Sequence, residues 1–267
     1  MYEAHFGLSG RPFGETVDPS SYVALPSRET VIRRVRYGLE HGQGPAIVFG
    51  PPGSGKTLLA RALAVALGSP TAHLTFPAMP AAELLNYLAD ELGAATTSDV
   101  SLAGSLRRLG TLLSAAVRRG ERPLLIVDEA HLIDDPSTFE SLRALLNFAT
   151  LGPPDLMLLL VGAPEVLLRL PPGLCDRLTA RCLLGPLTEF ETAAYVHGRL
   201  SAAGARETLF NPDALSALYL ASDGLPRRLN RLADLALLVS YAEGLARPDA
   251  SSIAVAVRES DPDALTA

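Results

Sequence analysis

The chain has 267 residues, of which 48% are hydrophobic and 19% are charged, and its formal net charge is −6. Such a composition is typical of a globular protein with one large domain or two smaller ones, and it excludes an intrinsically disordered chain. The negative net charge disfavours broad nucleic-acid binding, although a local patch of arginine residues would still permit it.

Cysteine content and targeting signals narrow the cellular setting. The two cysteines, Cys175 and Cys182, do not make a disulfide framework, and no set of His and Cys has the spacing of a zinc site. The N-terminus lacks the basic flank and apolar run of a signal peptide. No stretch approaches the ~20 apolar residues of a membrane span. We therefore expect a cytoplasmic protein with no membrane span in this chain.

Residues 1–26 contain scattered glycine, proline and aromatic residues without a regular period. We interpret this segment as an N-terminal arm that packs on the core. Its apolar anchors would be Phe6, Phe13 and Tyr22. Ser27 is of a residue type that caps helix N-termini, and apolar residues at helical spacing predict a helix from there to about Glu40.

A short apolar strand at 46–49 and a helix ending near residue 67 enclose the sequence GPPGSGKT. This sequence fits G-x-x-x-x-G-K-[ST], the phosphate-binding P-loop, in its required strand–loop–helix setting. Glycines let successive backbone N–H groups turn toward a phosphate, and the helix N-terminus adds its positive dipole end. The expected nucleotide-binding residues are Gly50, Pro51, Pro52, Gly53, Ser54, Gly55, Lys56, Thr57 and Leu58.

Two side chains of this loop carry specific chemistry. Lys56 should reach the β- and γ-phosphates of a nucleotide, and the Thr57 hydroxyl should ligate Mg²⁺. Lys56 is also the single lysine among 23 basic residues. A chain that otherwise uses arginine keeps its one ammonium group where a compact point charge on phosphate is needed.

The elements that follow alternate between apolar strands and amphipathic helices, which predicts a parallel sheet flanked by helices. They are a strand at 72–76, helices at 81–92 and 101–118, a strand at 123–127, a helix at 136–147, and strands at 156–161 and 181–184. Four helices without a strand follow, the first opened by a capping box of Thr188 and Glu191 and the second by Asn211 before a proline. We therefore divide the chain into the arm, a nucleotide-binding domain at 27–186 and a helical domain at 187–267.

The strand at 123–127 is followed directly by Asp128 and Glu129. Behind a P-loop this pattern is typical of a Walker B motif, in which Asp128 supports Mg²⁺ and Glu129 orients and deprotonates the attacking water. An acidic pair that begins a loop or caps the next helix is the structural alternative. With Ala130 and His131 the pair also spells the DEAH box of a helicase class. That class needs two nucleotide-binding cores, and we find motifs for one.

Several longer motifs span nearly the whole chain: the opening FGLSGRPFGETVDP, the P-loop, LLIVDEAH, LLLVGAPEV, PLTEFETAAYVHGRL and GLPRRLNRL. With them the chain resembles AAA+ ATPases, and more narrowly the cytoplasmic ATPase of the general secretion pathway protein A (ExeA/GspA) group. The resemblance implies an α/β P-loop NTPase fold, with a three-layer parallel sheet and a C-terminal helical lid. It also implies ATP and Mg²⁺ as cofactors, ATP hydrolysis, and a homo-oligomer with a partner in the secretion machinery.

The same resemblance assigns roles to further residues. Arg227 matches the sensor-2 arginine that reaches the γ-phosphate from the lid. Arg177 matches the arginine finger offered to a neighbouring subunit, with Arg181 as the competing choice. Relatives carry a polar residue after the glycine of the fourth strand, where this chain has Ala163. The usual contact with the attacking water is therefore missing or comes from elsewhere, and Asn147 is a candidate.

Three functions remain open at this point. The first is an oligomeric ATPase that acts on an unidentified partner in secretion or envelope assembly. The second is a DNA-associated, ATP-dependent regulator resembling the TniB/MuB transposition proteins, and its DNA path would use arginines 33, 34, 36, 107, 108, 227, 228 and 231. The third is a nucleotide-binding scaffold with weak turnover, which Ala163 would explain.

Overall fold

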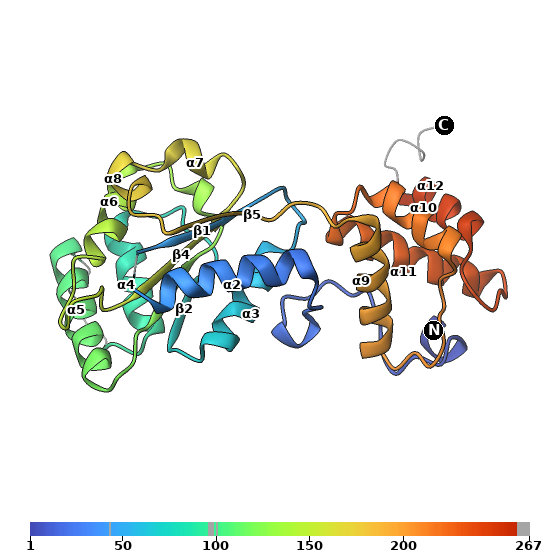
Figure 1. The fold of residues 1–267 in the computed structure, drawn as a ribbon, viewed down its shortest axis with the longest axis horizontal. Helices are drawn as coiled ribbons and strands as arrows, with labels where there is room; N and C mark the ends of the chain where they lie inside the picture. Colours follow the sequence, from blue (N-terminus) through green and yellow to red (C-terminus); the bar gives the residue numbers. More distant parts are fainter. Residues whose placement is uncertain (43, 96–98, 100, 261–267) are drawn as a thin grey trace. The chain divides into compact units, whose positions relative to one another are not determined.

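The computed structural model describes residues 1–42, 44–95, 99 and 101–260. The chain forms two compact units (Figure 1). The sheet unit comprises Thr30–Pro52 and Lys56–Leu184. The helical unit comprises Met1–Glu29, Gly53–Gly55 and Gly185–Ala267. Among the described residues, no helix is long and apolar enough to cross a membrane.

The sheet unit is built on five parallel strands in the order β2-β3-β4-β1-β5. The strands are β1 (Ala46–Phe49), β2 (Thr71–Leu74), β3 (Leu124–Val127), β4 (Met157–Gly162) and β5 (Ala180–Leu183). All residues of β3 and β4 are buried. Both strands are covered on the two faces of the sheet, which explains why they are continuous apolar runs.

Helices lie on both faces of this sheet, which makes three layers in all (Figure 1). On one face, Ile47, Leu125 and Leu158 pack in a single cluster with leucines of three helices. Those helices are α4 (Ala81–Glu91), α5 (Leu102–Arg118) and α6 (Pro136–Leu145). Alternate strand residues such as Val48 and Leu159 point to the opposite face. Near that face run α2 (Pro26–Glu40), which begins in the helical unit, and α3 (Lys56–Leu67).

The three-layer parallel sheet predicted from the sequence is confirmed. One boundary is corrected, because α2 begins at Pro26 and not after Ser27. The Ser27 backbone N–H is taken up by Glu191, whose Oε1 accepts it at 2.8 Å. Proline needs no partner for a missing N–H and suits the first turn of a helix. A distant carboxylate and a proline therefore start this helix in place of a serine cap.

The helical unit contains four longer helices: α9 (Glu189–Ala202), α10 (Pro212–Ser222), α11 (Pro226–Ala242) and α12 (Ala250–Ser260). The predicted capping box is confirmed, since Thr188 Oγ1 accepts from the Glu191 N–H at 3.2 Å and Glu191 accepts from the Thr188 N–H at 3.3 Å. Asn211 caps α10 through its side-chain oxygen, as expected. No strand occurs in the described part of this unit, residues 1–29, 53–55 and 185–260.

The N-terminal arm belongs to the helical unit. Its Phe6 and Phe13 are buried in one cluster with residues of α9 to α12, and not against the sheet. Asp234 of α11 holds the arm in place, accepting hydrogen bonds from Tyr2 at 2.6 Å and from Arg11 at 2.8 Å. The domain boundaries at 26 and 186 remain a prediction.

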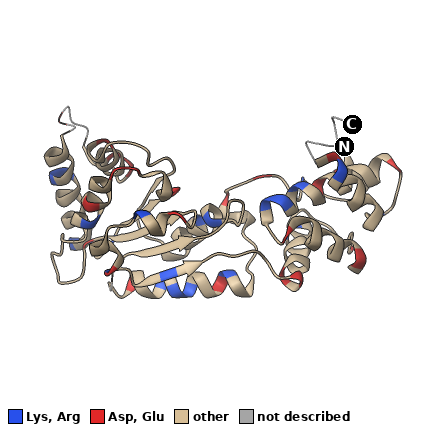
Figure 2. Cartoon of the chain, turned by 90° about the horizontal axis from the view of Figure 1, so that it is seen from above, with Lys and Arg blue, Asp and Glu red and all other residues tan. Residues whose placement is uncertain are grey.

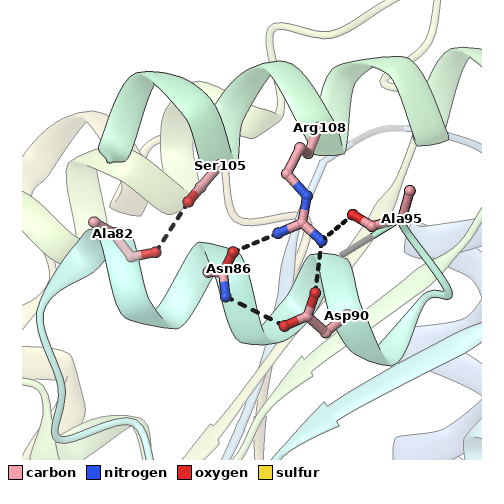
Figure 3. Close-up of polar contacts among 6 residues, drawn as sticks. All are labelled: Ala82, Asn86, Asp90, Ala95, Ser105 and Arg108. Atoms are coloured by element: carbon pink, nitrogen blue, oxygen red, sulfur yellow. Dashed lines mark hydrogen bonds and ion pairs between the residues drawn. The ribbon is translucent and has the colours of Figure 1, made fainter. Parts of the chain in front are cut away.

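A largely buried arginine side chain, that of Arg108, ties α4 to α5 in the sheet unit (Figure 3). The Arg108 guanidinium donates to Asn86, to Asp90 at 2.6 Å and to the Ala95 carbonyl at 2.7 Å. Its side chain is only 13% exposed. One guanidinium group thus donates to three acceptors, two on α4 and one just after it. We infer that Arg108 stabilises the packing of α5 on α4.

Replacing Arg108 with alanine should lower the free energy of unfolding by about 2 kcal/mol, because charge-assisted hydrogen bonds are lost and their acceptors are left unpaired. Urea unfolding followed by circular dichroism would measure it. The neighbouring Arg107 is the matched control, since its side chain is 76% exposed and pairs with Asp99 at 3.5 Å. Arg107→Ala should change stability by less than about 0.5 kcal/mol. Equal losses in both variants would contradict a structural role specific to Arg108.

Candidate nucleotide-binding site

The predicted site residues gather at the carboxyl ends of three neighbouring strands. The P-loop follows β1, Asp128 and Glu129 follow β3, and Gly162 ends β4, which lies between them. The Gly50 backbone N–H donates to the Gly162 carbonyl at 3.2 Å and so extends the ladder beyond β1. In open α/β sheets, ligands bind beyond this edge of the strands.

The loop backbone has the shape that a phosphate cradle requires. Gly53 and Gly55 have φ angles of +79° and +92°, which side-chain-bearing residues rarely adopt. A Cβ atom at Gly55 would meet nothing within 4 Å, so the space there is open to a ligand. Ser54 Oγ is buried and has no hydrogen-bond partner among the described residues. These features fit a bound phosphate chain.

Lys56 is the first residue of α3 and is 93% buried, with 7% of its surface exposed. Its Nζ donates to the carbonyls of Gly50 and Pro51, each at 3.0 Å. The ammonium group therefore lies folded against its own loop, within reach of any phosphate held there. Its role at the phosphates remains a prediction.

Asp128 is buried, and its Oδ1 accepts a hydrogen bond from the Glu129 backbone N–H at 2.9 Å. Burial acts to raise the pKa of the Asp128 carboxyl, but donors from His73, Thr57 and the Glu129 backbone N–H together hold that pKa below its usual value. His73 Nε2, from the neighbouring strand β2, lies 3.5 Å from Asp128 Oδ2. The aspartate is thus kept as an anion beside Thr57.

This pair suits Mg²⁺ bound jointly with a nucleotide. Among the described residues, no group of three or more His, Cys, Asp or Glu could hold a metal ion alone. Mg²⁺ usually takes one or two protein oxygens and completes its shell with waters and substrate phosphates. A hydroxyl and one ionised carboxylate fit that requirement.

Glu129 follows Asp128 in a left-handed backbone conformation, with φ 49° and ψ 35°. This conformation is uncommon for a residue with a side chain and is found more often at functional sites. The Glu129 side chain is 43% exposed, and its Oε2 lies 3.4 Å from His131 Nδ1. The carboxylate is therefore accessible to a water molecule beyond the sheet.

The end of β4 lacks a polar side chain, as the sequence indicated, and Asn147 does not replace it. Asn147 lies at the amino-terminal edge of the sheet, where the Phe148 carbonyl accepts from the Asp155 N–H just before β4 begins. Its Oδ1 accepts from Arg177 at 3.0 Å. The suggestion that Asn147 contacts the attacking water is therefore wrong, because the two groups lie at opposite ends of the strands.

Arg177 and Arg181 are both exposed in the sheet unit. Arg177 donates to Asn147, and Arg181 donates to the Cys175 carbonyl at 2.7 Å. In the described part of the chain, neither side chain contacts the P-loop of its own chain. The same would be expected of an arginine that serves the site of a neighbouring subunit. The choice between them remains a prediction.

In the helical unit, Arg227 lies beside a P-loop residue. Its backbone N–H donates to the Gly53 carbonyl at 3.2 Å, and a Cβ atom at Gly53 would approach Arg227 Cβ to 3.0 Å. Arg28 of the same unit is 6% exposed, with its Nη2 3.4 Å from the Ser54 carbonyl. Burial lowers the Arg28 pKa, partly offset by Glu191 and Tyr22. Arg227 thus contacts Gly53, and Arg28 contacts Ser54.

Comparison with known proteins decides which fold family this geometry represents. Residues 39–170 match the AAA domain family. These residues are an AAA domain. The AAA domain is a P-loop NTPase, which implies nucleotide binding.

The chain carrying this AAA domain is similar to general secretion pathway protein A of Aeromonas hydrophila, with 34% identity over 251 residues. The match covers 91% of this chain and 46% of that relative, so the chain spans less than half of the relative's length.

Solved structures support the fold. The Cdc6p structure from Pyrobaculum aerophilum superimposes with a TM-score of 0.71 at 20% identity, covering 89% of this chain and 67% of that one. The Aeropyrum pernix ORC2 protein, in ADPNP–ADP complexes, gives 0.69 at 20% identity over 93% and 71%. The AAA+ fold with a C-terminal helical region is therefore established for this chain.

The sequence analysis gave no role at the site to three residues near the AAA domain motifs: Arg28, His73 and His131. His73 is a titratable residue between Ala72 and Leu74 in the strand next to the Walker B strand, and that irregularity was the available signal. Arg28 gave none, because its contact with Ser54 is tertiary. His131 was noted only as the end of the DEAH string, and its contact with Ala163 is likewise tertiary. The carboxylate and loop residues needed no such contact to be found.

Proposed function

We propose that this chain binds ATP with Mg²⁺ and hydrolyses it as an oligomeric ATPase in secretion or envelope assembly. The observation that carries the proposal is the position of the P-loop after β1 and of Asp128 and Glu129 after β3, at the same edge of one parallel sheet and on either side of β4. The assignment to secretion rests on the similarity to general secretion pathway protein A. Because ATP is kept inside cells, the reaction places the chain in the cytoplasm.

In this proposal each side chain has one task. The loop N–H groups and Lys56 hold the phosphates. Thr57 and Asp128 would hold Mg²⁺, which supplies charge neutralisation on the phosphate oxygens when bound. Glu129 accepts the proton of the attacking water. Arg227, and Arg177 from a neighbouring subunit, would stabilise the negative charge on the transferred phosphoryl group.

Arg227 is our candidate for contacting the γ-phosphate, supported by its place beside Gly53. Arg227→Ala should therefore weaken ATP binding more than ADP binding, by about tenfold, since a charged hydrogen bond to phosphate is worth about 1.5–3 kcal/mol. Equilibrium titration with both nucleotides measures this difference. The adjacent Arg228 is a matched control, because it is exposed and pairs with Asp223 at 2.7 Å. Equal losses for ATP and ADP would contradict a γ-phosphate contact.

The oligomeric part of the proposal is tested with two inactive variants, Arg177→Ala and Glu129→Gln. If each site uses its own Glu129 and a neighbour's Arg177, about a quarter of the interfaces in an equal mixture pair two intact residues. Mixing should then restore ATP hydrolysis that neither variant has alone. Arg181→Ala, mixed in the same way, tests the competing arginine.

Co-assembly must be verified in the mixtures by light scattering or native mass spectrometry. Mixed oligomers that stay inactive would contradict a shared site. Turnover per subunit that does not depend on protein concentration, measured on a monomeric wild type, would contradict the oligomeric ATPase altogether.

The DNA-associated alternative receives less support. Basic and acidic residues are interspersed over the described residues (Figure 2). Of the arginines that were to line a DNA path, Arg108 is engaged by three acceptors and Arg228 by Asp223. Arg36 pairs with Glu40 at 2.8 Å on the exposed side of α2. These arginines are largely neutralised by neighbours.

A further inference from the structure

One ring nitrogen of His131 lies near two partners with opposite needs. Nδ1 is 3.3 Å from the Ala163 backbone N–H nitrogen and 3.4 Å from Glu129 Oε2. The backbone group donates and needs a lone pair on Nδ1, whereas the carboxylate accepts and needs a proton there. A neutral imidazole carries one proton, so the Nδ1–H tautomer binds Glu129 and the Nε2–H tautomer binds Ala163.

Close packing places His131 at this point. It lies in the short turn Ala130–Leu132, which packs directly on the end of β4. A Cβ atom at Gly162 would lie 3.3 Å from the His131 backbone nitrogen and 3.4 Å from His131 Nδ1. The imidazole therefore occupies the end of β4 where Ala163 provides only a methyl group.

Glu129 needs such a neighbour. Its side chain is 43% exposed, on a backbone of uncommon conformation. A general base works only when its carboxylate is held within hydrogen-bond reach of the water, and small misplacements are costly. The His131 side chain, 24% exposed, is more buried than the carboxylate beside it.

We propose that His131 is a positioning residue that orients the Glu129 carboxylate through Nδ1, in place of a polar side chain at residue 163. The proposal rests on the function of Glu129 proposed above. It requires only the Nδ1 side of the ring, which allows two amides to be compared. Asparagine places donor and acceptor atoms near Nδ1, and glutamine places them near Nε2.

The test compares His131→Asn, His131→Gln and His131→Ala in steady-state ATP hydrolysis, with ATP affinity measured separately by equilibrium titration. We expect kcat to fall by about tenfold or more for Gln and Ala, and by less than about threefold for Asn. ATP affinity should stay unchanged in all three. An unchanged kcat for Ala, equal losses in all three variants, or a loss of affinity that accounts for the effect would overturn the proposal.

A second measurement does not depend on hydrolysis. In ¹⁵N-histidine NMR spectra, the His131 ring resonances are those absent from the His131→Asn protein, and the other four of the five histidines serve as references. Glu129→Gln should move the His131 Nδ1 resonance, because a neutral amide replaces the carboxylate next to it. An unmoved resonance would overturn the contact. If Glu129→Gln moves the resonance but the wild type binds ATP without hydrolysing it, the contact is supported and the proposed function is overturned.

Discussion

Replacing Lys56 with alanine should weaken ATP binding by about 10²-fold, the equivalent of about 3 kcal/mol, because a charged donor to the phosphates is lost. The fold should persist, since Gly53 and Gly55 keep the loop backbone that alanine at residue 56 does not disturb. The substitution also removes two hydrogen bonds within the loop, because Lys56 Nζ donates to the carbonyls of Gly50 and Pro51. Equilibrium titration with a fluorescent ATP analogue measures the affinity.

Lys56→Arg is the informative control for this experiment. It keeps the positive charge but replaces a compact ammonium by a planar, wider group. We expect an intermediate affinity, with unfolding free energies of both variants close to that of the wild type. Equal ATP affinity for wild type and Lys56→Ala would remove the P-loop from the proposed function.

Replacing Glu129 with glutamine should lower turnover by about 10²- to 10⁴-fold, the usual contribution of a general base. The amide keeps the shape of the side chain but does not accept the proton of the attacking water. ATP affinity should change little, because Lys56 and the loop backbone hold the phosphates. Phosphate release under saturating ATP measures the turnover, and the titration used for Lys56 measures the affinity.

Glu165→Gln serves as the matched control, because Glu165 is an exposed carboxylate just beyond β4 at the same edge of the sheet. It should leave turnover unchanged. If Glu129→Gln behaves like Glu165→Gln, Glu129 only begins the turn that follows Asp128, which is the structural alternative weighed from the sequence.

The sequence sufficed for elements whose signals are local. The run Leu124–Val127 predicted a strand buried on both faces, and Thr188 with Glu191 predicted a helix start that the capping box confirms. It failed at Pro26, where the helix start depends on a carboxylate 164 residues away from Ser27. A local pattern does not contain that contact.

The candidate site divides in the same way. Its loop and acidic pair are contiguous in sequence and were found from it. His73 comes near Asp128 because β2 and β3 are neighbours in the sheet, and His131, though close to Glu129 in sequence, meets Ala163 because β3 and β4 are neighbours. Asn147 was misplaced for the same reason, since the helix before β4 delivers it to the amino-terminal edge. Arg108 looked like part of a basic surface until its acceptors were placed around it.

The helical unit draws its core from both ends of the chain, and this affects the order of events during synthesis. Tyr2, Phe6 and Phe13 leave the ribosome before the sheet unit, yet α9, the earliest helix that covers them, begins only at Glu189. At about 5–20 residues per second, these aromatic residues wait roughly 10–40 s without their partners. The sheet unit, nearly continuous from Thr30 to Leu184, can fold within that interval. Newly made chains would therefore pass through a stage in which the sheet unit is folded and the aromatic residues of the N-terminal arm are still exposed. During this stage chaperones and other nascent chains have access to the arm.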